Sequence, residues 1–332
     1  MPLVSIITAT WNHGEFIEAC VGSVKQQTFS DWEQIIIDDG STDATLERAH
    51  IGMGSDTRVK VIRQERKGIC RLAETYNRGL AAADGKYIAI IEGDDVWPVD
   101  KLETQVAAME ECPRAVLSFG YFDRLDAEGR VLFSRASGTR EFSARLIPGL
   151  DALKGLLVGG LTVMPVTVLI TAEALRTIGG FQQPRYYPAV EHPTWLNLAY
   201  RGDFLRIPRI LGCWRRHVGQ TSDMRGVRLS AGVARCNSEF FELLGGEVRS
   251  QLGISAGMLR IERRRALARA FFAQGRFNVV RGRRDRAKRN FGVAFRLGDL
   301  NIRAKAGIAL ASLYLGLNPE IIIGLLRGTR YQ

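Results

Sequence analysis

Residues 34–41 read Gln34-Ile35-Ile36-Ile37-Asp38-Asp39-Gly40-Ser41, an apolar run that ends abruptly in an acidic turn. The segment Tyr87-Ile88-Ala89-Ile90-Ile91-Glu92-Gly93-Asp94-Asp95 follows the same plan. Continuous runs of branched apolar residues, without polar alternation, indicate strands that helices cover on both faces, and hence a largely parallel sheet. Ligands of such sheets bind beyond the carboxyl ends of the strands, where both acidic turns lie. The predicted fold class is therefore α/β, with a doubly wound first half.

Further strands and helices alternate on either side of these two segments. Strands are expected near residues 4–9, 59–62, 115–119, 163–170 and 210–215, and helices near 17–24, 71–83, 172–178 and 193–201. Beyond about Met224 strand patterns give way to Arg-, Ala- and Leu-rich helical patterns. We predict a mixed-sheet domain at residues 1–224 and a basic helical region at 225–332, in which residues 266–275 and 287–297 form a helical hairpin.

The positive charge of the chain is concentrated in its tail. The chain has 332 residues and a formal charge of +11. Residues 251–332 hold 17 Lys and Arg against 4 Asp and Glu, a balance of +13, so residues 1–250 carry −2. Such a tail can contact anionic lipid, an acidic partner or nucleic acid, and a solvated helix surface explains its charge equally well. Because the first 250 residues lack this charge, no nucleic-acid partner is expected.

The location of the protein is predicted from its cysteines and apolar segments. Five scattered cysteines without a CxxC pair favour reduced thiols in the cytoplasm. The first residues carry no basic stretch before their short apolar run, which is unlike a secretory signal. The most apolar segment, residues 306–326, is interrupted by Asn318-Pro319-Glu320, so neither half is long enough to span a bilayer. A peripheral contact at the inner membrane face remains open.

The acidic turns need a physical explanation because clustered carboxylates repel one another. A divalent cation would remove that cost. Glu92, Asp94 and Asp95 offer the hard oxygen ligands that Mg²⁺ or Mn²⁺ accepts while positions stay open for phosphate oxygens. A metal at this edge would neutralise a diphosphate leaving group. A solvated acidic turn before the helix near Lys101 is the simpler alternative.

Several motifs occur together in an order that resembles glycosyltransferase family 2, whose members have the GT-A fold. The resemblance covers about residues 1–222. Its motifs are Val4-Ser5-Ile6-Ile7 with Trp11-Asn12, Ser23 to Thr28, Ile37 to Asp43, Asn77 to Leu80 with Gly85 to Tyr87, and Glu92 to Trp97 with Lys101-Leu102. It implies inverting transfer of a sugar from a nucleotide diphosphate donor, UDP or dTDP in preference to GDP, with Mn²⁺ or Mg²⁺ as cofactor. The acceptor is expected to be a hydroxyl of a glycan or a lipid-linked molecule in cell-envelope polysaccharide biosynthesis.

The resemblance also implies which residues hold the donor nucleotide. Asp39 matches the carboxylate that accepts a hydrogen bond from the imide of the base. Ala9 and Trp11 match positions beside the base, where an aromatic ring can stack. Arg71 lies in the segment that usually meets the nucleotide, although Thr75-Tyr76-Asn77 stands where the family often has Ala-Arg-Asn.

Metal ligands are implied in the same way. Glu92 and Asp94 match the first and last acids of the DxD motif, with glutamate replacing the first aspartate. Asp94 is the principal expected ligand and Asp95 is its neighbour. His217 follows Trp214-Arg215-Arg216, which resembles the closing motif of the family, and could add a nitrogen ligand.

The general base is expected where the family has a Glu-Asp pair at the start of a helix. Aligning Trp195-Leu196 places Glu191 at the base position and Val190 at the preceding acid. A shift of one residue would instead select His192. Since one acid of the pair is lost, a catalytically degenerate GT-A domain that binds a sugar or a surface is the alternative function.

Two other enzyme classes fit less well. A nucleotidyltransferase usually has a glycine-rich basic loop after the first strand to hold a triphosphate. Here the corresponding turn is Thr10-Trp11-Asn12-His13-Gly14, with one glycine and no lysine. A NAD-dependent enzyme is disfavoured because the GxGxxG motif is missing.

Overall fold

The protein consists of two compact units, Met1–Val218 and Gly219–Gln332. A computed structural model describes residues 1–134, 143–217, 220–317 and 319. The expected domain limit at residue 224 falls inside helix α8 (Thr221–Leu243), whereas the division between the units precedes this helix. Each unit is described separately below.

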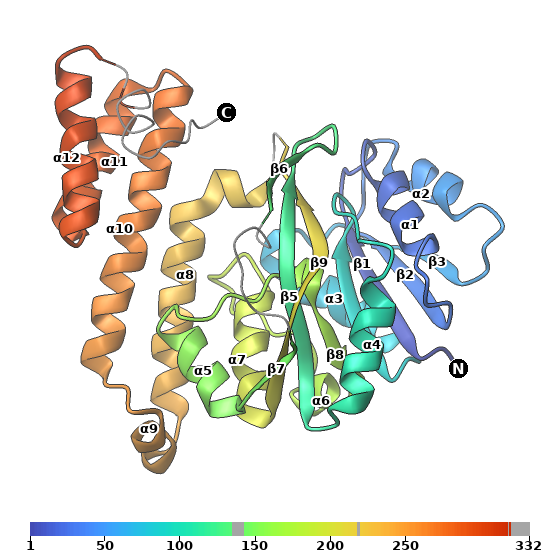
Figure 1. Cartoon of the computed structure of the whole chain (residues 1–332). Helices are drawn as coiled ribbons and strands as arrows, with labels where there is room; N and C mark the ends of the chain where they lie inside the picture. The colour runs from blue at the N-terminus through green and yellow to red at the C-terminus, as the bar shows by residue number, and fades with distance from the viewer. Residues whose placement is uncertain (135–142, 218–219, 318, 320–332) are drawn as a thin grey trace. The chain divides into compact units, whose positions relative to one another are not determined.

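Unit 1 is built on one mixed sheet in the order β3-β2-β1-β4-β8-β5-β9-β7, with β6 paired to β5 (Figure 1). Its strands are β1 (Val4–Thr10), β2 (Trp32–Asp38), β3 (Val59–Arg63), β4 (Tyr87–Glu92), β5 (Ala115–Leu125), β6 (Val131–Ser134), β7 (Arg145–Ile147), β8 (Leu169–Thr171) and β9 (Asp203–Arg215). The strands β1 to β4 are mutually parallel, and β8 runs antiparallel to both β4 and β5. Since β9 is parallel to β5, its carboxyl end lies at the same edge as those of β1, β2 and β4.

Helices cover both faces of the parallel strands, as their uninterrupted apolar runs predict. Buried residues of α1 (Ile17–Lys25) and α4 (Lys101–Glu111) pack with Val4 and Ile6 on one face. On the other face lies α3 (Leu72–Ala81), whose Gly79 leaves no room for a side chain against Ile7. The remaining elements of unit 1 are α2 (Thr45–Met53), α5 (Gly149–Leu157), α6 (Ala172–Thr177), α7 (Glu191–Arg201) and the 3-10 turns η1 (Ile69–Arg71) and η2 (Pro165–Thr167).

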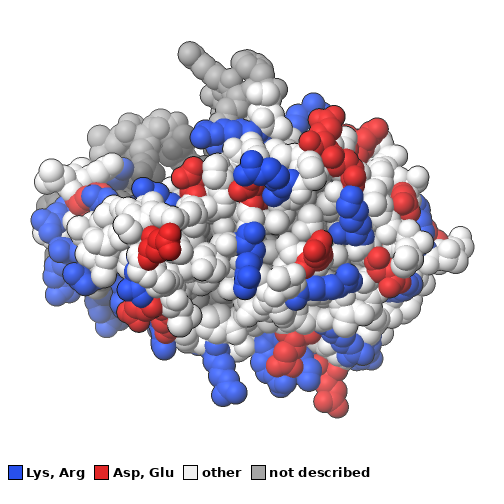
Figure 2. Space-filling view, turned by 90° about the horizontal axis from the view of Figure 1, so that it is seen from below, with Lys and Arg blue, Asp and Glu red and all other residues white. Residues whose placement is uncertain are grey.

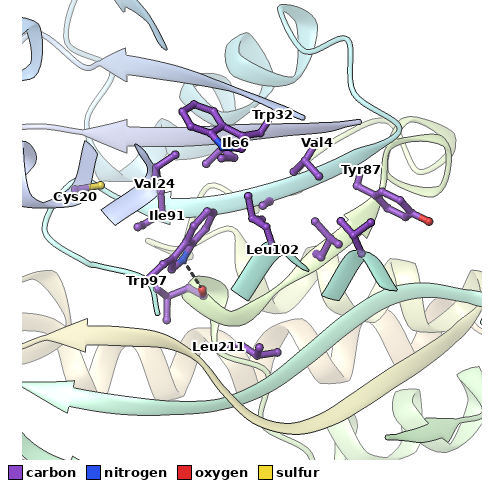
Figure 3. Close-up of a cluster of buried hydrophobic side chains, with 14 of the residues drawn as sticks. Val4, Ile6, Cys20, Val24, Trp32, Tyr87, Ile91, Trp97, Leu102 and Leu211 are labelled. Atoms are coloured by element: carbon purple, nitrogen blue, oxygen red, sulfur yellow. Dashed lines mark hydrogen bonds between the residues drawn. The ribbon is translucent and has the colours of Figure 1, made fainter. Parts of the chain in front are cut away.

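The main core joins the parallel strands to the second half of the sheet. Figure 3 shows the Trp97 side chain beside Leu102 in this core, with its indole Nε1 donating to the carbonyl oxygen of Val166 at 2.9 Å. Nearby, the fully buried Lys101 ammonium donates to Gln105 Oε1 at 2.5 Å and to the Val168 carbonyl at 3.2 Å. Burial holds the pKa of Lys101 well below its usual range. These bonds attach the loop after β4 firmly to the sheet.

One local prediction was wrong. The strand expected at residues 163–170 is interrupted: residues 165–167 form a 3-10 turn, because Pro165 favours the start of a turn, and only Leu169–Thr171 joins the sheet. Before α2, the Asp43 carboxylate accepts from the backbone N–H of Thr45, the first residue of that helix, at 3.0 Å.

Unit 2 is helical and contains the predicted hairpin. Its helices are α8, α9 (Gly246–Leu252), α10 (Ala256–Val280), α11 (Arg284–Leu297) and α12 (Leu300–Tyr314). Phe272 of α10 and Phe291 of α11 pack at 5.4 Å between ring centroids, and Ala306 and Leu313 of α12 complete this cluster. Among the helices of the described ranges, none combines the length and apolarity that a bilayer crossing requires. Most of the interrupted segment after Leu317 lies outside the described residues.

Candidate functional site

Four strand ends and one helix start surround the predicted site. In the sheet register Thr10 pairs with Asp38, and Ala9 pairs with Glu92, so β1, β2 and β4 end side by side. Carboxyl ends of neighbouring parallel strands form the crevice in which α/β proteins bind ligands. The buried Ala9 lies in this edge. The sheet topology thus brings together residues that are far apart in the sequence.

Asp39 is held by an unusually complete set of donors. Its Oδ1 accepts from Gln64 Nε2 and from the backbone N–H of Lys67, both at 2.8 Å, and its Oδ2 accepts from the backbone N–H of Gly68 at 2.8 Å. Gln64 is fixed in turn by Thr75 Oγ1 at 2.8 Å. A carboxylate has about four lone-pair sites, so three donors leave one for a ligand. The carboxylate is therefore fixed in place and can still accept one more hydrogen bond.

Trp11 is the aromatic residue at this edge, and an arginine covers it. The Trp11 side chain is 38% exposed, and the Arg66 guanidinium lies 3.4 Å from the ring centroid. Arg71, the arginine expected at the nucleotide, is exposed and pairs with Glu74 at 2.5 and 2.7 Å. The Arg66 guanidinium thus covers the face of Trp11 on which the sequence analysis expected the donor nucleobase to stack. The Arg71 guanidinium is paired with Glu74, in the first turn of the helix that follows it.

The carboxyl groups of the acidic cluster after β4 have raised pKa values. Burial, together with the charges of Asp94 and Glu191, raises the pKa of Glu92 to about 8. Burial and the same Asp94 charge also raise the pKa of Asp95 well above its usual range. Arg215 stabilises this cluster, since its backbone N–H donates to Asp95 Oδ1 at 2.9 Å and its Nε donates to the Asp94 carbonyl oxygen at 2.8 Å. Closely placed carboxylates with raised pKa values indicate a functional site.

Two histidines meet at Asp94. The Nε2 atom of His217 lies 3.0 Å from Asp94 Oδ2, and the Nε2 atom of His13 lies 3.9 Å from the same oxygen. Burial lowers the pKa of His13 despite the nearby Asp94. The ligand atoms of these three residues all lie within 4.8 Å of one another, and so do those of Glu92, Asp94 and Asp95. Asp94 therefore belongs to two groups of side chains, and either has the donor chemistry for a divalent metal.

Glu191 begins helix α7 beside this cluster. Its Oε2 accepts from the backbone N–H of Val190 at 3.0 Å, and burial raises its pKa. The negative charge of Glu191 contributes to the raised pKa of Glu92. Burial, together with the charges of Glu92 and Glu191, also raises the pKa of the Tyr76 hydroxyl well above its usual range. His192, the alternative base, follows in the first turn and is half-buried. A glutamate with a raised pKa beside a candidate metal site can act as a general base.

Sequence reasoning missed three members of this site: His13, Arg66 and Tyr76. His13 lies in the polar turn that follows the first strand, so a search of every strand end for metal-ligand side chains would have found it. Tyr76 occupies the middle residue of the segment that departs from the family pattern. Nothing in the local sequence marks Arg66.

Comparisons with known proteins identify the family of this chain. The family profile described as Glycosyl transferase family 2 matches residues 5–151. The putative teichuronic acid biosynthesis glycosyltransferase TuaG of Bacillus subtilis is 34% identical over 203 residues, which cover 60% of this chain and 73% of TuaG. The UDP-Glc:alpha-D-GlcNAc-diphosphoundecaprenol beta-1,3-glucosyltransferase WfgD of Escherichia coli is 39% identical over 108 residues, or 32% of this chain and 41% of WfgD.

A solved structure shares the fold. The crystal structure of S. aureus TarS 1-349 in complex with UDP-GlcNAc superposes with a TM-score of 0.58 and 15% sequence identity. The match covers 100% of this chain and 93% of that one. The predicted α/β fold of the GT-A type, with a helical region after it, is confirmed.

Proposed function

The chain belongs to glycosyltransferase family 2, and from this we propose that it transfers a sugar from a nucleoside diphosphate to an acceptor hydroxyl with inversion at the anomeric carbon. The observation that carries the proposal is the meeting, at one edge of the sheet, of a fixed Asp39 carboxylate, the cluster around Asp94 and the half-buried Glu191. These are a base-binding group, a metal-binding group and a proton acceptor. The finding that the protein is a glycosyltransferase rests on its relatives.

The chemical step is a direct displacement. Glu191 accepts the proton of the acceptor hydroxyl while the hydroxyl oxygen forms a bond to the anomeric carbon. The bond between that carbon and the diphosphate oxygen breaks, and the nucleoside diphosphate leaves with both electrons. A divalent metal held at Asp94 would neutralise the charge that develops on the diphosphate. Arg215 keeps Asp94 and Asp95 in place through its two hydrogen bonds.

The donor nucleotide is proposed to be UDP or dTDP linked. Asp39 retains one acceptor site after its three protein donors, which suits the single imide N–H of uracil or thymine. WfgD, whose name states a UDP-Glc donor, is similar to part of this chain. The Arg66 guanidinium, which covers the Trp11 ring at 3.4 Å, is a flat cationic group on which a base can stack in place of the tryptophan.

The acceptor is proposed to be a glycan or a lipid-linked molecule, with the protein held peripherally at an anionic membrane face. TuaG is named for the biosynthesis of an envelope polymer, and the acceptor named for WfgD is a lipid diphosphate. The balance of +13 on residues 251–332 would attract such surfaces. On the face drawn in Figure 2, Asp and Glu are interspersed among Lys and Arg.

Calorimetric titration of UDP, dTDP and GDP, each with and without Mn²⁺, tests the donor site. We expect metal-dependent binding of UDP or dTDP, lost on Asp39→Ala and on Asp94→Ala. Asp31→Ala serves as the matched control, because Asp31 is exposed at the opposite end of β2. If no nucleotide binds to the folded wild-type protein, the enzymatic proposal fails and the degenerate binding domain replaces it.

A further inference from the structure

The loop after β1 brings a second imidazole to Asp94. His13 and His217 come from opposite ends of unit 1, yet both present Nε2 to the same oxygen, Asp94 Oδ2, at 3.9 and 3.0 Å. Their side chains are 20% and 14% exposed, and that of Asp94 is 6% exposed. The two ring centroids are 6.2 Å apart and the rings are nearly perpendicular. Two imidazole nitrogens and one carboxylate oxygen within reach of one another are donor atoms that a divalent transition ion accepts.

We propose that His13 is a ligand of the divalent metal, together with Asp94 and His217, and that the two imidazoles make this site prefer Mn²⁺ and other transition ions to Mg²⁺. The inference deepens the proposed function and rests on its metal-dependent donor site. It assigns to His13 a role that neither the family motifs nor the local sequence suggested.

The spacing of the ligand atoms fits a six-coordinate ion. Ligands about 2.1 Å from such an ion lie about 3.0 Å apart when adjacent and about 4.2 Å apart when opposite. The distances from Asp94 Oδ2 to His217 and to His13, 3.0 and 3.9 Å, fall within this range.

Neighbouring groups already orient His13 for this role. Its Nδ1 lies 3.2 Å from Thr10 Oγ1, a hydroxyl that can accept the Nδ1 proton and leave the Nε2 lone pair directed at Asp94. Gly93 is required beside them, since a side chain there would collide with Thr10 Oγ1 and lie 2.9 Å from His13 Nδ1. Phe16 packs against the His217 ring at 4.6 Å between centroids. Metal-binding histidines are commonly supported in this way.

The alternative group, Glu92, Asp94 and Asp95, is less suited to hold the ion by itself. Asp95 Oδ1 already accepts the backbone N–H of Arg215 at 2.9 Å, so Asp95 anchors the end of β9. Imidazole nitrogen favours transition ions, whereas carboxylate and water oxygens suit Mg²⁺. A metal held by the two histidines and Asp94 should therefore be a transition ion such as Mn²⁺, whereas a metal held by the three carboxylates could equally be Mg²⁺. Measuring the relative affinity for Mn²⁺ and Mg²⁺ distinguishes the two groups of ligands.

The test measures Mn²⁺ binding to the full-length protein, alone and with UDP, by the loss of the free Mn²⁺ electron paramagnetic resonance signal. We expect Mg²⁺ to displace Mn²⁺ only at concentrations at least about tenfold higher. His13→Gln should weaken Mn²⁺ binding by at least about tenfold. Spin-echo modulation of bound Mn²⁺ should show two coupled imidazole nitrogens in the wild type and one in His13→Gln, a readout independent of activity.

His50→Gln is the matched control, because His50 is exposed on α2 and should change neither quantity. Thr10→Val keeps both imidazoles and should weaken binding less than His13→Gln does. Wild-type affinity and two coupled nitrogens in His13→Gln would overturn the assignment while leaving the metal-dependent donor site intact. Failure of the wild type to bind Mn²⁺ even with UDP would overturn both, whereas UDP binding without metal would retain the nucleotide site alone.

Discussion

At the scale of single residues, the site depends on carboxylates kept away from water. Glu92, Asp95 and Glu191 all have pKa values raised first of all by burial. A raised pKa makes Glu191 a stronger proton acceptor, provided that the pH is high enough to ionise it. The Glu191 carboxylate also accepts the backbone N–H of Val190, which fixes its orientation at the start of α7.

Replacing Glu191 by Gln should lower kcat by about 10²- to 10⁴-fold, because the amide cannot accept the acceptor proton. In the wild type, kcat/KM should fall as the pH drops through the pKa of Glu191, which burial raises from its ordinary value, because the protonated carboxyl group cannot accept a proton. Transfer assays over a pH series check both statements. Glu173→Gln, at the exposed first turn of α6, should leave the rate unchanged. An unaltered rate in Glu191→Gln would direct attention to His192.

At the scale of elements, the packing of unit 2 depends on a glycine between two helices. A Cβ atom at Gly275 of α10 would lie 2.5 Å from Phe291 Cε1 of α11. At Gly292, also in α11, a Cβ atom would meet nothing within 4 Å. An alanine at either position gains helix propensity, but only an alanine at Gly275 would collide with a neighbouring side chain. Comparing the two substitutions therefore separates the effect of helix propensity from the effect of packing.

Gly275→Ala should destabilise the chain by about 1–3 kcal/mol from overpacking, partly offset by about 1 kcal/mol of gained helix propensity. Gly292→Ala should stabilise it by up to about 1 kcal/mol, because only the propensity changes. Urea unfolding of both full-length variants, followed by far-ultraviolet circular dichroism, measures the difference. Equal midpoints for the two would mean that α10 and α11 pack less closely than described.

At the scale of the whole molecule, charge is divided unevenly along the sequence. Residues 1–250 carry a balance of −2, and residues 251–332 carry a balance of +13. Electrostatic attraction of a basic segment to an anionic surface falls as salt rises. This division is the physical basis of the proposed peripheral contact with membranes.

Flotation with vesicles that contain anionic lipid should recover more protein than flotation with neutral vesicles, and the difference should shrink as salt rises. A triple variant that replaces the exposed Arg283, Arg286 and Arg289 by Gln should weaken this partitioning by up to about 100-fold, at about 1 kcal/mol for each charge near the surface. The control replaces the exposed Arg48, Arg114 and Arg130 of unit 1 by Gln and removes the same charge. Equal flotation on both kinds of vesicle would remove the membrane proposal.

The sequence by itself determined the parallel strands and the acidic turns at their ends. Both are local properties: an unbroken apolar run such as Ile35 to Ile37 indicates burial on both faces, and the acidic residues follow it directly. The local pattern predicted helix α7 at residues 193–201, and the helix begins two residues earlier, at Glu191, where the family resemblance had placed its start. The 3-10 turn at Pro165 was not predicted, because a short apolar run does not distinguish a strand from a buried turn.

Only the tertiary structure decided which distant side chains meet. His13 and His217 share Asp94 because the sheet order places the ends of β1, β4 and β9 at one edge, and no local pattern encodes that order. Arg66 lies on Trp11 for a similar reason, since two loops after different strands approach each other there. Burial within this assembled edge, rather than residue type, raises the carboxyl pKa values. The sequence thus supplied the chemical groups, and the fold determined which of them act together.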